Sequence, residues 1–176
     1  IDHLLTGLDT QFDQIVIATG ALAINGAAPE KSISTLNAQA MMDQFAVNTI
    51  GPALVLKHAK TLLPRDRPSQ ICALSARVGS IGDNRLGGWY SYRASKAALN
   101  QVVRTASIEL ARTHPLAACV ALHPGTVETE FTRKYLGRHP AVPALEAAEN
   151  LIKVMDNLGP SQTGQFFDWA GKPVAW

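Results

Sequence analysis

The chain has 176 residues, 47% of them hydrophobic and 17% charged, and this length and composition suit one domain with a sizeable core. The formal net charge of +2 and the lack of any run rich in Lys and Arg argue against a nucleic-acid-binding surface. No apolar stretch approaches the roughly 18 residues that a membrane span requires, none resembles a signal peptide, and a chain this apolar is not disordered.

Short apolar segments alternate with longer amphipathic ones along the first half of the chain. Pro52 falls within the longest of these, where a proline requires a kink in the helix. The predicted elements are, in order, the tail of an amphipathic helix (1–12), a buried strand (13–18), a loop rich in Ala, Gly and Pro (21–37), a long helix (38–63) and a second strand (70–74).

The same alternation continues in the second half. The predicted elements are a glycine-rich loop (75–90), a second long helix (91–112), a third strand (116–122), a loop that carries a short helix (128–135), a last helix (144–158) and a fourth strand (164–168). Uniformly apolar strands that alternate with helices indicate parallel βαβ units covered on both faces. The sequence therefore predicts an α/β fold in a single domain.

In parallel sheets of this kind, ligands bind beside the carboxyl ends of the strands. The loops that begin at Thr19, Ser75 and His123 are therefore the candidate site. The five histidines have no metal-ligand spacing with one another or with the cysteines, so no metal site is expected.

Tyr92 and Lys96 lie four residues apart at the start of the second long helix, and this spacing puts both side chains on one face. A tyrosine with a pKa of about 10 is a poor base near neutral pH, and a cation beside it favours the phenolate. Lowering this pKa by about three units requires roughly 4 kcal/mol, which Lys96 and the charge of a bound cofactor could supply together. Taken alone, such a pair is more often ordinary surface packing.

The segment Tyr92-Arg-Ala-Ser-Lys96 resembles the Tyr-x-x-x-Lys signature of the short-chain dehydrogenase/reductase family, and the resemblance runs from about residue 13 to the last residue. Four further segments match: the turn after the first strand (15–20), the helix segment that bears Asn48 (45–52), the strand that delivers the catalytic serine (71–75) and the Pro-Gly segment that packs against nicotinamide (123–129). The resemblance implies a Rossmann-like, doubly wound parallel sheet, represented here by the family's strands four to seven with their covering helices.

Two longer runs, 79–100 and 164–176, resemble a C-factor-like, sniffer-type subgroup of carbonyl reductases within the family. This resemblance implies an NAD(P)-dependent oxidoreductase that moves hydride between nicotinamide and a carbonyl or secondary alcohol. Tyr92 is then the expected general acid/base, and Lys96 is expected to lower its pKa and hold the nicotinamide ribose. Asn48 is expected to kink its helix and to anchor a water that links Lys96 to solvent.

The resemblance also assigns binding residues. Those expected to contact NADP or NAD are Thr19, Gly20, Tyr92, Lys96, Pro124, Gly125, Val127 and Thr129. Those expected to line the substrate pocket are Leu86, Trp89 and Tyr135, although aromatic residues of this kind are as often plain packing.

Two positions depart from the family pattern. The family has two serines at the end of the second strand, of which the second is catalytic, whereas this chain has Ser75 followed by Ala76. Ser75 is the provisional catalytic serine, Ser80 is a weaker substitute, and the alternative is that no serine assists. Ala18-Thr19 replaces the family's Asn-Asn, so the tie between neighbouring strands is expected to be weaker or to be made by Thr19.

No glycine-rich phosphate turn follows a strand anywhere in the 176 residues. In the family this turn joins the first strand to the first helix and binds the cofactor pyrophosphate. The resemblance therefore implies a single domain, residues 1–176, that lacks its first three strands and is inactive alone. A longer polypeptide is the preferred explanation, and a genuine truncation is the alternative.

A second class of function stays open. Ala76 and the absent phosphate turn favour a nucleotide-binding regulatory or interaction module with weak or no catalysis. A serine hydrolase is disfavoured because no Gly-x-Ser-x-Gly segment is present. The choice between NAD and NADP and the identity of the small-molecule substrate stay undetermined, because the residues that discriminate the cofactors precede Ile1.

Cys72 and Cys119 each lie in a short apolar run, which predicts buried free thiols in a reducing, cytoplasmic compartment. The helices predicted over 38–63 and 91–112 correspond to the usual dimer face of the family, so the resemblance implies a homodimer or homotetramer. The alternative is that these helices only cover the sheet.

Overall fold

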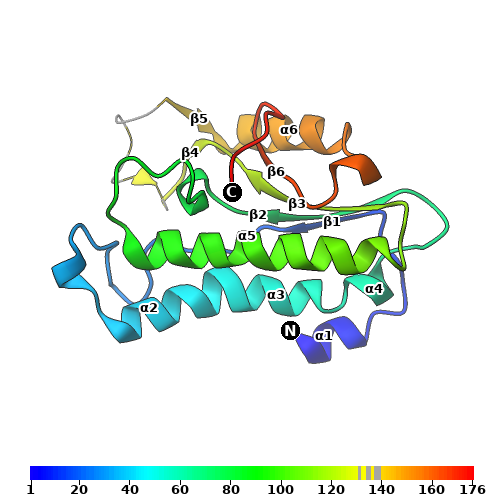
Figure 1. The fold of residues 1–176 in the computed structure, drawn as a ribbon, viewed down its shortest axis with the longest axis horizontal. Helices are drawn as coiled ribbons and strands as arrows, with labels where there is room; N and C mark the ends of the chain where they lie inside the picture. Colours follow the sequence, from blue (N-terminus) through cyan, green and yellow to red (C-terminus); the bar gives the residue numbers. More distant parts are fainter. Residues whose placement is uncertain (131, 134–135, 137–139) are drawn as a thin grey trace.

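The computed structural model describes residues 1–130, 132–133, 136 and 140–176 of the chain. A four-stranded parallel sheet lies between two layers of helices (Figure 1). Its strands, in spatial order, are β1 (Gln14–Ile17), β2 (Ser69–Leu74), β3 (Ala117–His123) and β6 (Phe166–Asp168). The prediction of an α/β fold built on a parallel sheet is therefore confirmed.

The side chains of the central strands alternate between two apolar clusters. Ile71 and Cys119 are register partners, and their side chains face the layer formed by α3 (Gly51–Leu56) and α5 (Tyr90–Ala111). The alternate side chains of the same strands, such as that of Cys72, face α6 (Ala144–Met155) on the other side of the sheet. Burial on both faces explains why these strands are uniformly apolar.

The helix predicted over 38–63 is interrupted in the structure. It consists of α2 (Ala38–Phe45), a π-helical turn η2 (Ala46–Ile50), α3 and, after a short turn, α4 (Ala59–Leu62). Pro52 lies in the first turn of α3, where its missing N–H costs little, and the wider π turn precedes it. The proline is thus accommodated by a change of helix type.

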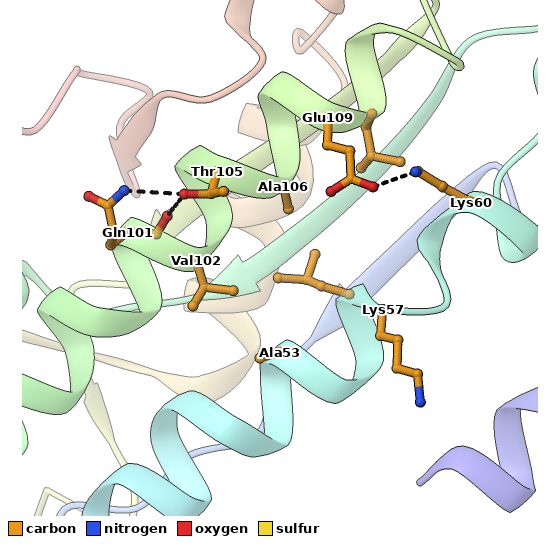
Figure 2. Close-up of a pocket in the computed structure, with 10 residues that line it drawn as sticks. Ala53, Lys57, Lys60, Gln101, Val102, Thr105, Ala106 and Glu109 are labelled. Atoms are coloured by element: carbon orange, nitrogen blue, oxygen red, sulfur yellow. Dashed lines mark hydrogen bonds and ion pairs between the residues drawn. The ribbon is translucent and has the colours of Figure 1, made fainter.

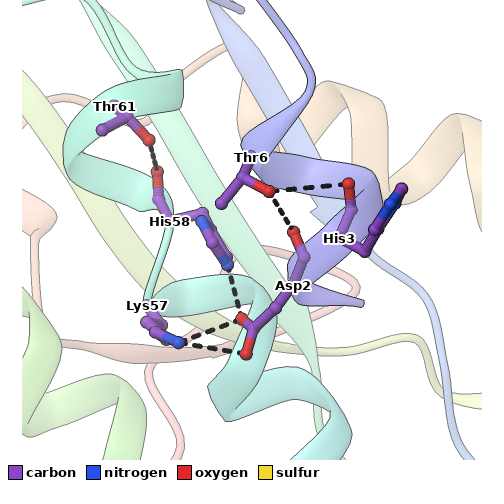
Figure 3. A network of polar contacts seen from close by, with 6 residues as sticks. All are labelled: Asp2, His3, Thr6, Lys57, His58 and Thr61. Carbon is purple, nitrogen blue, oxygen red and sulfur yellow. Dashed lines mark hydrogen bonds and ion pairs between the residues drawn. The ribbon is translucent and has the colours of Figure 1, made fainter.

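The helix predicted over 1–12 is shorter, because α1 (Asp2–Thr6) ends at Gly7. Asp2 fastens α1 to the helical layer by accepting a hydrogen bond from Lys57 Nζ at 3.1 Å and contacting His58 Nε2 at 2.7 Å (Figure 3). One carboxylate thus links α1 to the segment between α3 and α4.

A second, two-stranded parallel sheet was not predicted. It pairs β4 (Thr126–Glu128) with β5 (Ala141–Pro143) near α6. The short helix predicted around 128–135 is wrong at its start, because Glu128 is the last residue of β4, and part of its remainder lies outside the described residues. The described residues also form the 3-10 turns η1 (Ile33–Thr35), η3 (Arg77–Gly79) and η5 (Pro160–Gln162).

Candidate active site

The loops that follow β1, β2 and β3 leave the sheet at the same edge, because the three strands are parallel. The amino-terminal end of α5 lies next to this edge, since η3 in the loop after β2 packs against α5. The structure therefore brings the three predicted loops and the predicted Tyr–Lys helix together.

Tyr92 and Lys96 are both buried in the first turns of α5, and Lys96 Nζ lies 6.0 Å from the centroid of the Tyr92 ring. The ammonium donates a hydrogen bond to the carbonyl oxygen of Leu74, the last residue of β2, at 2.9 Å. Thr49 in the π turn donates to the carbonyl oxygen of Ser95 at 2.7 Å. Because Ser95 lies between Tyr92 and Lys96 in the sequence, this bond fixes η2 against the same turn of α5.

Burial dominates the protonation of both groups. It lowers the pKa of Lys96 from 10.5 to about 8, and it raises the pKa of Tyr92 above its ordinary value of 10.0. The direction at Tyr92 is opposite to the lowering expected from Lys96, because burial removes water from the phenol and disfavours its charged form. The protein alone thus holds the phenol protonated at neutral pH.

Asn48 makes three hydrogen bonds through its amide. Its Nδ2 donates to the carbonyl oxygen of Ala21 at 2.9 Å and to Gln44 Oε1 at 2.5 Å, and its Oδ1 accepts from the N–H of Ala21 at 2.8 Å. Gln44 Nε2 in turn donates to the carbonyl oxygen of Leu22 at 2.9 Å. The two amides therefore fasten the backbone after β1 to α2 and η2.

Gln44 is a residue that the sequence reasoning missed. It is the one buried residue of α2, whose other side chains are half-buried or exposed. Its position four residues before Asn48 is the signal that could have found it, because this spacing puts two amides on one helix face.

Gly20 lies where the turn after β1 meets the helices. A Cβ atom at this position would be 3.1 Å from Asn48 Oδ1 and 3.2 Å from Lys96 Nζ. The absence of a side chain leaves open space directly beside the ammonium. Gly20, Asn48 and Lys96 thus form one constellation, as their predicted roles require.

Ser75 and Ser80 direct their hydroxyls into the protein. Ser75 is buried and its hydroxyl donates to Asn100 Oδ1 at 2.6 Å, while Ser80 Oγ accepts from the N–H of Asp83 at 3.1 Å. Ala76 is the second residue after β2, at the position where the family pattern has its catalytic serine. The structure therefore shows Ser75 bonded to the interior of α5.

The Pro124–Thr129 segment continues from the carboxyl end of β3. Gly125 has a φ of +80°, and a Cβ atom there would lie 3.0 Å from Trp169 Cδ1. Val127 lies in β4, and the N–H of Thr129 donates to Thr132 Oγ1 at 3.2 Å. Trp169 packs against this segment and was not among the predicted residues.

His123 ends β3 beside Asp168 of β6. Burial and the charge of Arg77 lower its pKa to about 4, and Asp168 opposes this only in part. Its imidazole is therefore neutral at neutral pH. Tyr135, which was expected to line the pocket, lies outside the described residues.

Two features are absent from the described part of the chain. No group of three or more His, Cys, Asp or Glu side chains there could hold a metal ion. Within the same residues, no helix combines the length and the apolar character needed to cross a membrane.

A protein-family model described as enoyl-(acyl carrier protein) reductase matches residues 1–165. The chain is 35% identical over 144 residues to 1-hydroxy-2-glutathionyl-2-methyl-3-butene dehydrogenase of Rhodococcus sp. (strain AD45), which covers 82% of this chain and 62% of the relative. It is also 35% identical over 136 residues to C-signal of Myxococcus xanthus, with 77% of this chain and 78% of the relative covered.

Solved structures show the same fold. The carbonyl reductase Sniffer of D. melanogaster superposes with a TM-score of 0.84 at 26% identity, over 99% of this chain and 73% of that one. A short-chain dehydrogenase/reductase from Burkholderia multivorans with bound NADP gives a TM-score of 0.81 at 28% identity, over 99% and 71% of the two chains. The chain thus spans less than two thirds of the Rhodococcus relative and about seven tenths of these structures.

Proposed function

Because the chain belongs to the short-chain dehydrogenase/reductase family, we propose that the protein is an NAD(P)-dependent oxidoreductase that transfers hydride between nicotinamide and a carbonyl or secondary alcohol. The observation that carries this proposal is the constellation of Tyr92, Lys96, Asn48 and Gly20 at the carboxyl edge of the sheet. Bound NAD(P) would supply or accept the hydride.

The residues at this edge fit such a cofactor. The open space at Gly20, which a single Cβ would fill, adjoins an ammonium that has used one of its three N–H donors on Leu74. Lys96 would hold the nicotinamide ribose. The remaining proposed cofactor contacts are Thr19, Gly20, Tyr92, Pro124, Gly125, Val127 and Thr129.

Tyr92 is the proposed proton donor during carbonyl reduction. Its burial keeps the phenol protonated, which is the form that can donate to a carbonyl oxygen as negative charge develops there. Lys96, with its pKa near 8, loses charge easily and is the proposed route by which the proton is replaced. Asn48 would anchor a water on this route.

The test, made in a chain that includes the cofactor-binding strands proposed below, compares Tyr92→Phe with Tyr90→Phe, a phenol removed two residues away on the same helix. We expect Tyr92→Phe to lower kcat for NADPH-dependent reduction of aldehydes and quinones by about 100-fold or more, because general acid catalysis contributes about that much. Tyr90→Phe should retain the wild-type rate. A Tyr92→Phe variant with wild-type kcat would refute the assignment.

The hydrogen bond from Ser75 to Asn100 favours a second candidate, a nucleotide-binding module with weak or no catalysis. Binding of NADPH without turnover of any carbonyl would support it.

For the enzyme, we expect Ala76→Ser to raise kcat by about tenfold, since an added donor to a developing oxyanion can be worth more than this. Ser75→Ala should change kcat little unless Ser75 rotates away from Asn100 to assist.

We also propose that the protein forms a homodimer or homotetramer through the outer face of α3, α4 and α5. A shallow groove between these helices has a floor of Ala53, Val102 and Ala106, and Lys57 and the Lys60–Glu109 ion pair form its rim (Figure 2). Small residues allow a second helix pair to approach closely. Ala106→Arg should convert the oligomer to a monomer in light scattering, whereas Ala148→Arg, on exposed α6, should not.

The open edge of β1 supports a proposal about domain organisation. β1 is an end strand of the described sheet, so one of its edges is unpaired, and its Val16 side chain is 48% exposed. We propose that residues 1–176 belong to a single domain whose further strands pair with this edge and bind the cofactor phosphates. A chain that includes such strands should bind NADPH, and the 176 residues alone should not.

The two free buried cysteines support a cytoplasmic location, which cell fractionation would test.

A further inference from the structure

Two charged side chains hold the start of α5 from opposite sides. Helix α5 begins after Trp89, whose φ of +54° is left-handed and whose side chain makes no cap. The first N–H groups of a helix have no intrahelical partner and need one from elsewhere. For α5 this partner comes from Glu30, about sixty residues earlier in the chain.

Glu30 accepts hydrogen bonds from the residue before α5 and from the second residue of α5. Its carbonyl oxygen accepts the N–H of Trp89 at 2.5 Å, and its buried carboxylate accepts the N–H of Ser91 at 3.2 Å and the Ser91 hydroxyl. Burial raises the pKa of Glu30, but the hydrogen bonds from Ser91 and from its own N–H outweigh burial and leave this pKa below its ordinary value. The carboxylate is therefore ionised at neutral pH, which suits the positive end of the helix dipole.

Arg93 binds the loop that precedes α5. Its guanidinium donates to the carbonyl oxygens of Gly88 at 2.9 Å, Gly87 at 3.1 Å and Val78 at 3.2 Å. These carbonyls belong to the loop that connects β2 to α5 and that starts at Ser75. A planar guanidinium with five donors can bind three carbonyls at once, which an ammonium cannot do with the same geometry.

Tyr92 lies between the two residues that these contacts hold, Ser91 and Arg93. Glu30 ties the helix start to the loop after β1, which contains Gly20, and Arg93 ties it to the loop after β2. We propose that Glu30 and Arg93 are positioning residues for the Tyr92 phenol. Glu30 fixes it relative to the loop after β1, which holds the proposed cofactor contact Gly20, and Arg93 fixes it relative to the loop after β2, which holds the expected pocket residue Leu86. The inference rests on the proposed function, in which Tyr92 donates the proton.

A small displacement is enough to make these contacts matter. A misplacement of about 1 Å can cost on the order of 100-fold in rate, because proton transfer needs donor and acceptor within hydrogen-bond distance. We expect Glu30→Gln and Arg93→Met each to lower kcat by about 10- to 100-fold, with KM for NADPH changed by less than about threefold. Ser91→Ala, which removes only the hydroxyl donor, should lower kcat less.

The matched controls are Glu149→Gln on exposed α6 and Arg112→Met just after α5, which make the same chemical changes away from the site. Both should retain wild-type kcat. All variants should unfold cooperatively, and if Glu30→Gln does not fold, Ser91→Ala replaces it. The proposal would be overturned if Arg93→Met had the wild-type kcat and the folded Glu30→Gln variant, or Ser91→Ala in its place, had it too.

A double-mutant cycle separates positioning of Tyr92 from a general structural effect. If Glu30 acts through Tyr92, Glu30→Gln should have almost no further effect on the residual rate of Tyr92→Phe. If its effect in that background is as large as in the wild type, Glu30 acts elsewhere and the proposal fails.

An activity-independent measurement distinguishes this failure from failure of the proposed function. The chain has three tyrosines, so the Tyr92 Cζ resonance can be assigned with the Tyr92→Phe variant. Glu30→Gln and Arg93→Met should shift this resonance, and Glu149→Gln should not. An unchanged Tyr92 resonance would overturn the positioning role even in a protein that reduces no carbonyl.

Discussion

A methyl group at position 20 would meet both polar groups that define the proposed cofactor side of the site. Asn48 is held by three hydrogen bonds and Lys96 by its bond to Leu74, so neither can move away without losing a contact. We expect Gly20→Ala to lower kcat/KM by about 10- to 100-fold, measured by NADPH-dependent turnover. Gly7→Ala is the control, because a Cβ there would lie 3.7 Å from its nearest neighbours.

Lys96 also affects stability through its charge. Its pKa is about 8 in the folded protein and 10.5 ordinarily, so the folded state carries a buried ammonium below pH 8 and is relieved of this cost as the pH rises toward 10.5. We expect the free energy of unfolding of the wild type to rise relative to Lys96→Met between these pH values, by about 3 kcal/mol in total. Urea unfolding at several pH values measures the difference.

The comparison with Lys96→Met is needed because other groups act in the opposite direction. Burial raises the pKa of Cys72 and Cys119 from 9.0 to about 12, so these thiols ionise in the unfolded state first and destabilise the fold above pH 9. Both variants share this effect, and it cancels in the difference. A constant difference across pH 8–10.5 would contradict the assigned cost of burying Lys96.

At the scale of elements, the packing of η3 on α5 decides where Lys96 lies. A Cβ at Gly79 would lie 2.8 Å from both the carbonyl carbon and the Cβ of Lys96, closer than real contacts allow. Because both neighbours belong to a rigid helix, Gly79→Ala should lower the free energy of unfolding by about 1–3 kcal/mol. Gly159→Ala, with its nearest atom at 3.6 Å, should leave the urea midpoint nearly unchanged.

The elements also show what sequence patterns can and cannot predict. The buried strands and α5 follow from apolar runs and helical spacing, which are local signals. The hydrogen bonds between Asn48 and the backbone of Ala21 do not, because the two residues are distant in sequence. The same holds for Glu30, whose partner at the start of α5 is visible only once the chain has folded.

For the whole molecule, the order of the sheet and its two helical layers agree with the α/β prediction. The site is only partly predictable: spacing identifies Tyr92 with Lys96, and resemblance identifies Gly20 and Asn48. The orientation of the Ser75 hydroxyl and the position of Trp169 over Gly125 depend on tertiary packing. Sequence reasoning therefore finds the groups that carry chemistry more readily than those that hold them.

The sheet separates the two cysteines, and this gives the protein one internal reporter for each of its layers. Cys119 lies under α5 and Cys72 under α6, and both thiols are buried and protonated, so an alkylating reagent can reach them only when the covering layer opens. We expect Cys72 to react faster, because the apolar cluster over it is the smaller one. Single-thiol variants followed by mass spectrometry would measure the two rates, and equal rates would mean that both layers open only when the whole domain unfolds. Reagent kinetics can thus show whether the helices around the proposed active site move independently of the opposite face.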